Sequence, residues 1–170
     1  MRIIFFILLW GSLSDATLSP RMQSAMTQIS GSVTETRNHL GQHKMNNKFG
    51  IDLLYLVREG PTFGIRYLNE IRNESGFEKS QSYGFAIGYY AYSGLHALAY
   101  YDFQATTRLW SSGHGYQLSL GYLEHLGYHL HAGFQLSAKT TKYTTSTELS
   151  LVDSRIVNDQ FMSLVMMYLF

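Results

Sequence analysis

The chain contains no cysteine, which excludes a disulfide framework, a thiolate metal site and a cysteine nucleophile. Charged residues make up only 15% of the 170 residues, well below the roughly 25% of an average soluble protein. The net charge of +1 gives no electrostatic basis for binding nucleic acid. Long apolar runs are also missing after the first residues, and a membrane-spanning helix needs ~20 such residues. If the chain enters a membrane, it therefore does so as strands.

The first 16 residues have the features of a secretory signal peptide. Arg2 supplies the positive start, residues 3–10 form an apolar core too short to span a membrane, and residues 14–16 form a small-x-small cleavage site. We therefore expect cleavage after Ala16, a polar lead-in over 17–25 and one domain over 26–170. A retained N-terminal anchor is the alternative.

The stretch 113–137 shows the clearest pattern in the chain. Every second residue is large and apolar over 116–122 and again over 126–136, with a break at 123–125. A period of two indicates strands, so the two runs predict an antiparallel hairpin with its turn at the break. One face of this hairpin is wholly apolar and the other is small and polar. Such a contrast is typical of a barrel whose apolar face meets lipid.

The same alternation predicts further strands over 26–37, 48–58, 62–71, 82–92, 95–104 and 159–170. Tight turns are expected at 59–61 and 93–94, and four long polar connections at Asn38–Asn47, Arg72–Gln81, Ala105–Ser112 and Ala138–Asn158.

Long and short connections thus alternate along the chain, as they do in bacterial outer-membrane barrels. Both ends of the domain then fall on the periplasmic side, which requires an even number of strands. We predict an all-β fold, an eight-stranded antiparallel up-and-down transmembrane β-barrel. Ten strands would require an additional hairpin near Thr147.

Outward aromatic residues should collect at two heights of such a barrel, where amphipathic rings meet the membrane interfaces. The predicted external girdle comprises Phe49, Tyr83, Tyr101, Phe103, Tyr116 and Phe134. The predicted periplasmic girdle comprises Tyr55, Phe63, Tyr89, Tyr122, Tyr128, Tyr168 and Phe170.

The last strand resembles the C-terminal recognition strand of Gram-negative outer-membrane barrels. The chain ends on Phe170, with Tyr168 two residues before it and a polar Ser163 near the start of the pattern, although Val165 stands where the family often has glycine. The resemblance implies insertion into the outer membrane by the barrel assembly machinery. Over residues 26–170 the chain resembles the small eight-stranded barrels, such as the membrane domain of outer membrane protein A. This resemblance concerns architecture, and a fold alone does not assign a function.

An eight-stranded barrel has an interior just wide enough for side chains to fill it. We predict a polar network there, formed by Asp52, Arg66, Glu70, His96, Asp102, His129 and His131. One of two registers allowed by the turn at 59–61 places Asp52 opposite Arg66 and Lys48 opposite Glu70.

Buried charges are tolerated when they are paired, so we expect this network to close the lumen, and a narrow pore is the alternative. His129 and His131 could approach one metal ion together with Asp102 or His96, but a site needs three or four converging ligands. We expect no cofactor.

The expected role is structural or surface-interacting, with outer-membrane lipids around the barrel and a possible extracellular partner at the four loops, of which 138–158 is the best candidate. No nucleic acid partner and no enzymatic activity are expected. Three alternatives stay open. One is a narrow channel, and another is a soluble barrel of the lipocalin kind with its apolar face inside. The third is a lipid-modifying enzyme, whose best cluster would be Ser111, Ser112, His114 and Glu148.

Overall fold

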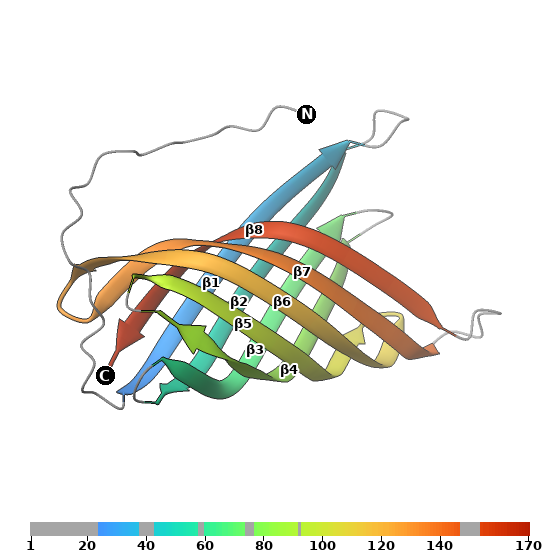
Figure 1. Ribbon diagram of the computed structural model, residues 1–170. Helices are drawn as coiled ribbons and strands as arrows, with labels where there is room; N and C mark the ends of the chain where they lie inside the picture. Colours follow the sequence, from blue (N-terminus) through green and yellow to red (C-terminus); the bar gives the residue numbers. More distant parts are fainter. Residues whose placement is uncertain (1–23, 38–42, 58–59, 74–76, 92, 147–153) are drawn as a thin grey trace.

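The computed structural model describes residues 24–37, 43–57, 60–73, 77–91, 93–146 and 154–170. The expected signal peptide and most of the lead-in lie outside these ranges. Eight antiparallel strands close into one barrel in chain order (Figure 1), which confirms the predicted all-β, eight-stranded antiparallel barrel. The strands are β1 (Ser24–Arg37), β2 (His43–Leu56), β3 (Pro61–Asn73), β4 (Phe77–Tyr90), β5 (Leu95–Thr107), β6 (Trp110–Gly127), β7 (Leu130–Ser146) and β8 (Arg155–Leu169). Among the described residues no helix is long and apolar enough to cross a membrane.

The barrel has two different ends. At the turn end, β1 begins, β8 ends, and short connections join β2 to β3, β4 to β5 and β6 to β7 (Figure 1). Gly60 and Gly94 lie in two of these connections with φ of 101° and 85°, a backbone conformation that favours glycine. The loop end carries the other connections. The short turns confirm the predicted positions near 59–61 and 93–94.

The wall of the barrel carries its apolar side chains outward. Leu118, Leu120 and Leu164 on the outer face are 68%, 65% and 73% exposed. Charged residues of other strands, such as Glu70 on β3 and Lys139 on β7, are buried inside. Because side chains alternate along a strand, each strand contributes to both faces.

The turn between β6 and β7 lies further along the chain than the sequence pattern predicts. Strand β6 continues through 123–125 to Gly127, and β7 starts at Leu130. Tyr128 and His129 connect the strands with φ of 43° and 72°. Positive φ at both central residues is the geometry of a type I′ hairpin turn. The prediction of a turn at 123–125 was therefore wrong.

The break in the pattern at 123–125 has a physical cause. Leu123 points inward, where it is 2% exposed within an apolar cluster. Glu124 lies on the other face and accepts a hydrogen bond of 2.5 Å from the Tyr122 hydroxyl. At this point the inward side chain is apolar and the outward one is polar, which is the reverse of the pattern over 116–122. The strand itself continues.

The long connections are shorter than predicted because the strands extend into them. Only Arg108 and Leu109 separate β5 from β6, where the sequence indicated a loop over 105–112. Strands β2, β3, β4, β7 and β8 similarly take up parts of the other three predicted loops, whose remaining centres, 38–42, 74–76 and 147–153, lie outside the described residues. The barrel also begins at Ser24, two residues earlier than predicted.

Strand pairing is least extensive between β1 and β8. Their residues are paired only from Met26, opposite Leu169, to Gly31, opposite Leu164. Beyond Gly31 the two strands diverge toward the loop end (Figure 1). We call this region the seam, defined as residues 32–37 of β1 and 155–163 of β8. Each of these stretches is paired only with its other neighbour, β2 or β7.

Candidate functional site

The interior of the barrel holds the polar side chains, and we built the candidate site from them. In the middle of the barrel, Asp52 Oδ2 accepts hydrogen bonds from Gln28 Nε2 at 3.1 Å and from the Tyr100 hydroxyl at 3.0 Å. Arg66 Nε lies 3.8 Å from Asp52 Oδ1, and its guanidinium lies 4.0 Å above the Tyr100 ring. The Tyr90 hydroxyl donates to Gln28 Oε1 at 2.6 Å. The register pairs Asp52 with Arg66, as the predicted alignment required.

A second group of charges lies on the loop-end side of this layer. Glu70 accepts hydrogen bonds from Arg72 Nη2 at 2.7 Å and from Lys139 Nζ at 3.0 Å, and Lys48 Nζ lies 3.4 Å away. Asp159 accepts from the same Arg72 nitrogen at 2.6 Å and from Lys48 Nζ at 3.0 Å.

Asp102 completes this group, with its Oδ2 lying 3.2 Å from Lys139 Nζ. We call these six residues the ion cluster: Lys48, Glu70, Arg72, Asp102, Lys139 and Asp159.

The ion cluster balances its own charge. Three cations face three anions, and they come from β2, β3, β5, β7 and β8. The side chains of Glu70 and Asp102 are 1% exposed. An isolated buried charge is costly, whereas a paired and hydrogen-bonded one is tolerated. The ion pairs therefore lower the cost of burying these charges, and the six side chains fill the space between the strands.

Apolar side chains occupy both sides of the polar layers. At the turn end, an apolar cluster comprises Met26, Leu54, Leu56, Ala86, Tyr90, Leu98, Tyr100, Leu123, Val165 and Met167. Toward the loop end, Ala105, Trp110 and Tyr143 form a smaller one. The interior is thus filled in layers, apolar, hydrogen-bonded, ionic and again apolar.

Five of the seven predicted network residues lie in these polar layers. Asp52, Arg66, Glu70, His96 and Asp102 are each 5% exposed or less. The imidazole Nε2 of His96 lies 3.2 Å from an amide oxygen of a neighbouring glutamine.

The other two predicted residues, His129 and His131, lie in different environments. His131 is 5% exposed, and its ring centroid lies 4.9 Å from that of His125. His129 is exposed in the turn between β6 and β7, so its predicted place in the lumen was wrong. Among the described residues no three His, Cys, Asp or Glu side chains are arranged to hold a metal ion.

Four members of the ion cluster were absent from the predicted network, and of these only Lys48 had been considered, as the residue opposite Glu70 in one of the two registers. Arg72 and Lys139 stand in stretches that the sequence indicated as loops, and Asp159 begins the predicted last strand. The signal for Lys139 was present, because Gln135, Ser137 and Lys139 continue the inward positions of β7 without interruption.

The aromatic residues of the outer face largely follow the predicted strands. Tyr101 packs against Tyr116 toward the loop end, with ring centroids 5.1 Å apart, and Tyr55 packs against Phe63 toward the turn end at 5.7 Å. Phe134 lies opposite Tyr122 on the adjacent strand, so it belongs near the turn end and not at the predicted opposite height.

Tyr128, another predicted girdle residue, lies in the β6–β7 turn and is 96% exposed. At the chain end, Tyr168 and Phe170 point outward with ring centroids 5.1 Å apart. The Phe170 amide donates to the Ala25 carbonyl at 2.9 Å, which ties the C-terminus to β1.

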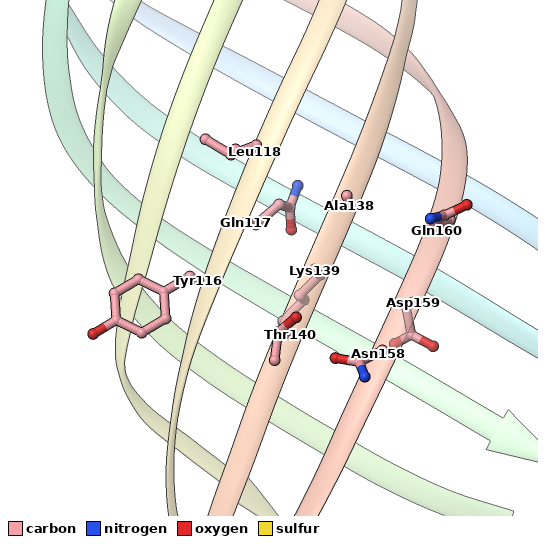
Figure 2. Close-up of a pocket in the computed structure, with 9 residues that line it drawn as sticks. All are labelled: Tyr116, Gln117, Leu118, Ala138, Lys139, Thr140, Asn158, Asp159 and Gln160. Atoms are coloured by element: carbon pink, nitrogen blue, oxygen red, sulfur yellow. The ribbon is translucent and has the colours of Figure 1, made fainter.

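The outer wall also contains a hollow of about 650 Å³ between β6, β7 and β8. Figure 2 shows that Ala138 and Thr140 of β7 are flanked there by larger side chains of β6 and β8. The hollow therefore follows from small outward residues on β7. Of the enzyme candidate cluster, Ser111, Ser112 and His114 lie on β6, and Glu148 lies outside the described residues.

Comparison of the chain with protein-family models, with curated proteins and with solved structures finds no match. The class of the protein therefore rests on its own structure, an eight-stranded antiparallel closed β-barrel with a charged interior.

Proposed function

We propose that the chain is an integral outer-membrane β-barrel that serves as a closed anchor for a surface-exposed end. The observation that carries the proposal is the inverted polarity of the wall. Large apolar side chains are exposed around the outside, whereas the charges are inside. A monomeric soluble protein rarely exposes contiguous apolar patches larger than a few hundred Å². Hydrocarbon around the barrel removes that difficulty, because neighbouring strands pair their backbone groups with one another around the closed barrel, least extensively between β1 and β8.

The same inversion disfavours the soluble ligand-binding barrel. That alternative needs the apolar face inside, around a ligand cavity. In the described structure the inward positions carry the ion cluster and the layer around Asp52. The outward aromatic residues near both ends also agree with the girdles of membrane barrels.

The filled interior supports a closed barrel and disfavours a channel. The ion cluster and the hydrogen-bonded layer span the lumen, and most of their side chains are nearly inaccessible to solvent. Ion passage would require the ion pairs to break while the charges remain buried, which is unfavourable. We therefore propose an anchor whose loop end is available to an extracellular partner, and whose C-terminal Tyr168 and Phe170 present the signal for the barrel assembly machinery.

Expression in a Gram-negative host tests the proposal. We expect the protein in the outer-membrane fraction, as a compact band that migrates differently after boiling. In planar bilayers the purified barrel should show no steady conductance. An unshifted band in the soluble periplasm would overturn the membrane assignment, and a stable unitary conductance would overturn the closed lumen alone.

A further inference from the structure

The outer wall has a second hollow, and it lies at the mouth of the seam. Its volume is about 700 Å³, and its lining includes Gly31 and Leu164, the last pair that joins β1 to β8. A Cβ atom added at Gly31 would meet no atom within 4 Å. The hollow therefore begins where the strand pairing stops. Its base is formed at Gly31, where the missing side chain leaves free space.

Apolar side chains surround the part of this hollow that faces away from the barrel. Val33, Phe49, Met162 and Leu164 point outward there and are between 47% and 73% exposed. These four side chains continue the apolar outer wall of the barrel. A hydrocarbon chain fits such a surface because it buries apolar area on both partners.

Polar atoms without partners line the same hollow. The Oδ1 atoms of Asn47 and Asn69, which stand at outward positions of β2 and β3, are buried and have no hydrogen-bond partner among the described residues. The Ser32 hydroxyl also lacks a partner, but Ser32 alternates with the outward Gly31 and Val33 and points into the barrel. A buried polar atom that lacks a hydrogen bond is costly, so each of the two asparagine oxygens is a place for a ligand group.

The hollow between β6, β7 and β8 provides an internal comparison. Its outward polar residues, Thr140, Asn158 and Gln160, carry no buried atom that lacks a partner in the described structure. Gln117 also lines that hollow and has an Oε1 atom without a partner, but its side chain points into the barrel. On the outward side that hollow therefore offers shape alone, whereas the hollow at the seam combines shape with the unsatisfied oxygens of the two asparagines.

We propose that the hollow at the seam binds one lipid whose acyl chains carry hydroxyl or amide N–H groups close to the head group. The chain lies over Gly31 between Val33 and Leu164, and the donors bond to Asn47 and Asn69. Two amide oxygens that need donors select such a lipid over one that has only ester acceptors. This inference rests on the proposed function, since it places the outer wall in a membrane.

Native mass spectrometry of the detergent-purified barrel tests the site with two probes. Lipid A carries amide-linked, hydroxylated acyl chains, and phosphatidylcholine carries no hydrogen-bond donor. We expect one lipid A per barrel, bound about tenfold more tightly than phosphatidylcholine, as the gain of one or two hydrogen bonds predicts. Equal retention of both lipids would overturn the proposal, and so would a dimer in place of the lipid adduct.

Variants locate the lipid. Gly31→Leu fills the hollow, and the double variant Asn47→Leu/Asn69→Leu removes the acceptors, so both should reduce the affinity for lipid A to that for phosphatidylcholine. Ala97→Leu is the matched control, because Ala97 is a small exposed residue on β5, outside the lining of the hollow. Retained lipid A binding in Gly31→Leu would overturn the site.

The gel shift on boiling is measured for every variant first. A protein that shifts normally and binds lipid A unselectively contradicts the lipid site alone. A wild-type protein that never shifts contradicts the proposed function itself.

Discussion

Two sides of this barrel close in different ways. Strands β6 and β7 are paired along nearly their whole length, from Trp110 to the turn after Gly127. Strands β1 and β8 are paired only between Met26 and Gly31 on β1, and they diverge beyond that point. The first contact is a backbone ladder, whereas the second needs another source of cohesion at the loop end.

Side chains of the interior supply that cohesion across the seam. Asp159 of β8 bonds to Lys48 of β2 and to Arg72 of β3, so its ion pairs pass over β1 on the inside. Phe161 of β8 adds a cation–π contact, with Lys48 Nζ 3.9 Å from its ring centroid. The comparison indicates that a barrel can be closed by its ladder on one side and by its buried charges on the other.

Removing the central anion should have the largest effect on this arrangement. In Glu70→Ala, three cations lose their shared partner, and we expect a loss of about 3–5 kcal/mol in the free energy of unfolding. Urea titration of the barrel in vesicles, followed by the gel shift, measures it. Glu124→Ala on the β6–β7 side is the control, since that carboxylate accepts its hydrogen bond from the outer Tyr122 hydroxyl and takes no part in the ion cluster. Equal losses in both variants would contradict the role given to the ion cluster.

A charge placed on the well-paired side tests the wall itself. Leu118 lies midway along β6 and points outward, and Leu118→Arg should cost about 2–4 kcal/mol in a bilayer. The same titration reports it, with Tyr128→Arg in the exposed turn as a control that should change little. A fully tolerated arginine at position 118 would be incompatible with lipid contact there.

A milder change should loosen the seam and leave β6 and β7 intact. Asp159→Asn keeps the shape but weakens the bonds to Lys48 and Arg72, with an expected loss of about 1.5–3 kcal/mol for hydrogen bonds to a charged group. Hydrogen exchange should accelerate at the amides of residues 155–161 and remain unchanged in β6. Uniform acceleration around the barrel would show that the seam is no separate unit.

The smallest effect is expected on the outer face of β6. Tyr122→Phe removes the hydroxyl that donates to Glu124 at 2.5 Å. Because this bond lies at the surface of the barrel, we expect a change of about 1 kcal/mol or less. The urea midpoint measures it, and a loss as large as that of Asp159→Asn would contradict the difference between the two sides.

The strands were predictable wherever the outer face is apolar. Alternation located most of the wall, and the tight turn before Pro61 allowed the register that pairs Asp52 with Arg66. Alternation loses its contrast toward the loop end, where both faces are polar, so Lys139 was assigned to a loop. Asp159 was placed on a strand, but no local signal shows that it reaches β2 and β3.

The turn at Tyr128 and His129 could not be found from residue type. A type I′ turn usually contains Asn-Gly or a similar pair, because both central residues need positive φ. Here a tyrosine and a histidine adopt it, at φ of 43° and 72°. The closed ladder on both sides of the turn imposes a conformation that these residues do not favour by themselves.

Alternation has a consequence for how the barrel avoids misassembly. A slip of one residue in any strand would exchange its two faces, turning Glu70 or Lys139 toward hydrocarbon and a leucine toward the ion cluster. A single basic residue at the middle of a bilayer costs about 2–4 kcal/mol. The surrounding lipid would thus make a misaligned strand energetically unfavourable before the barrel closes.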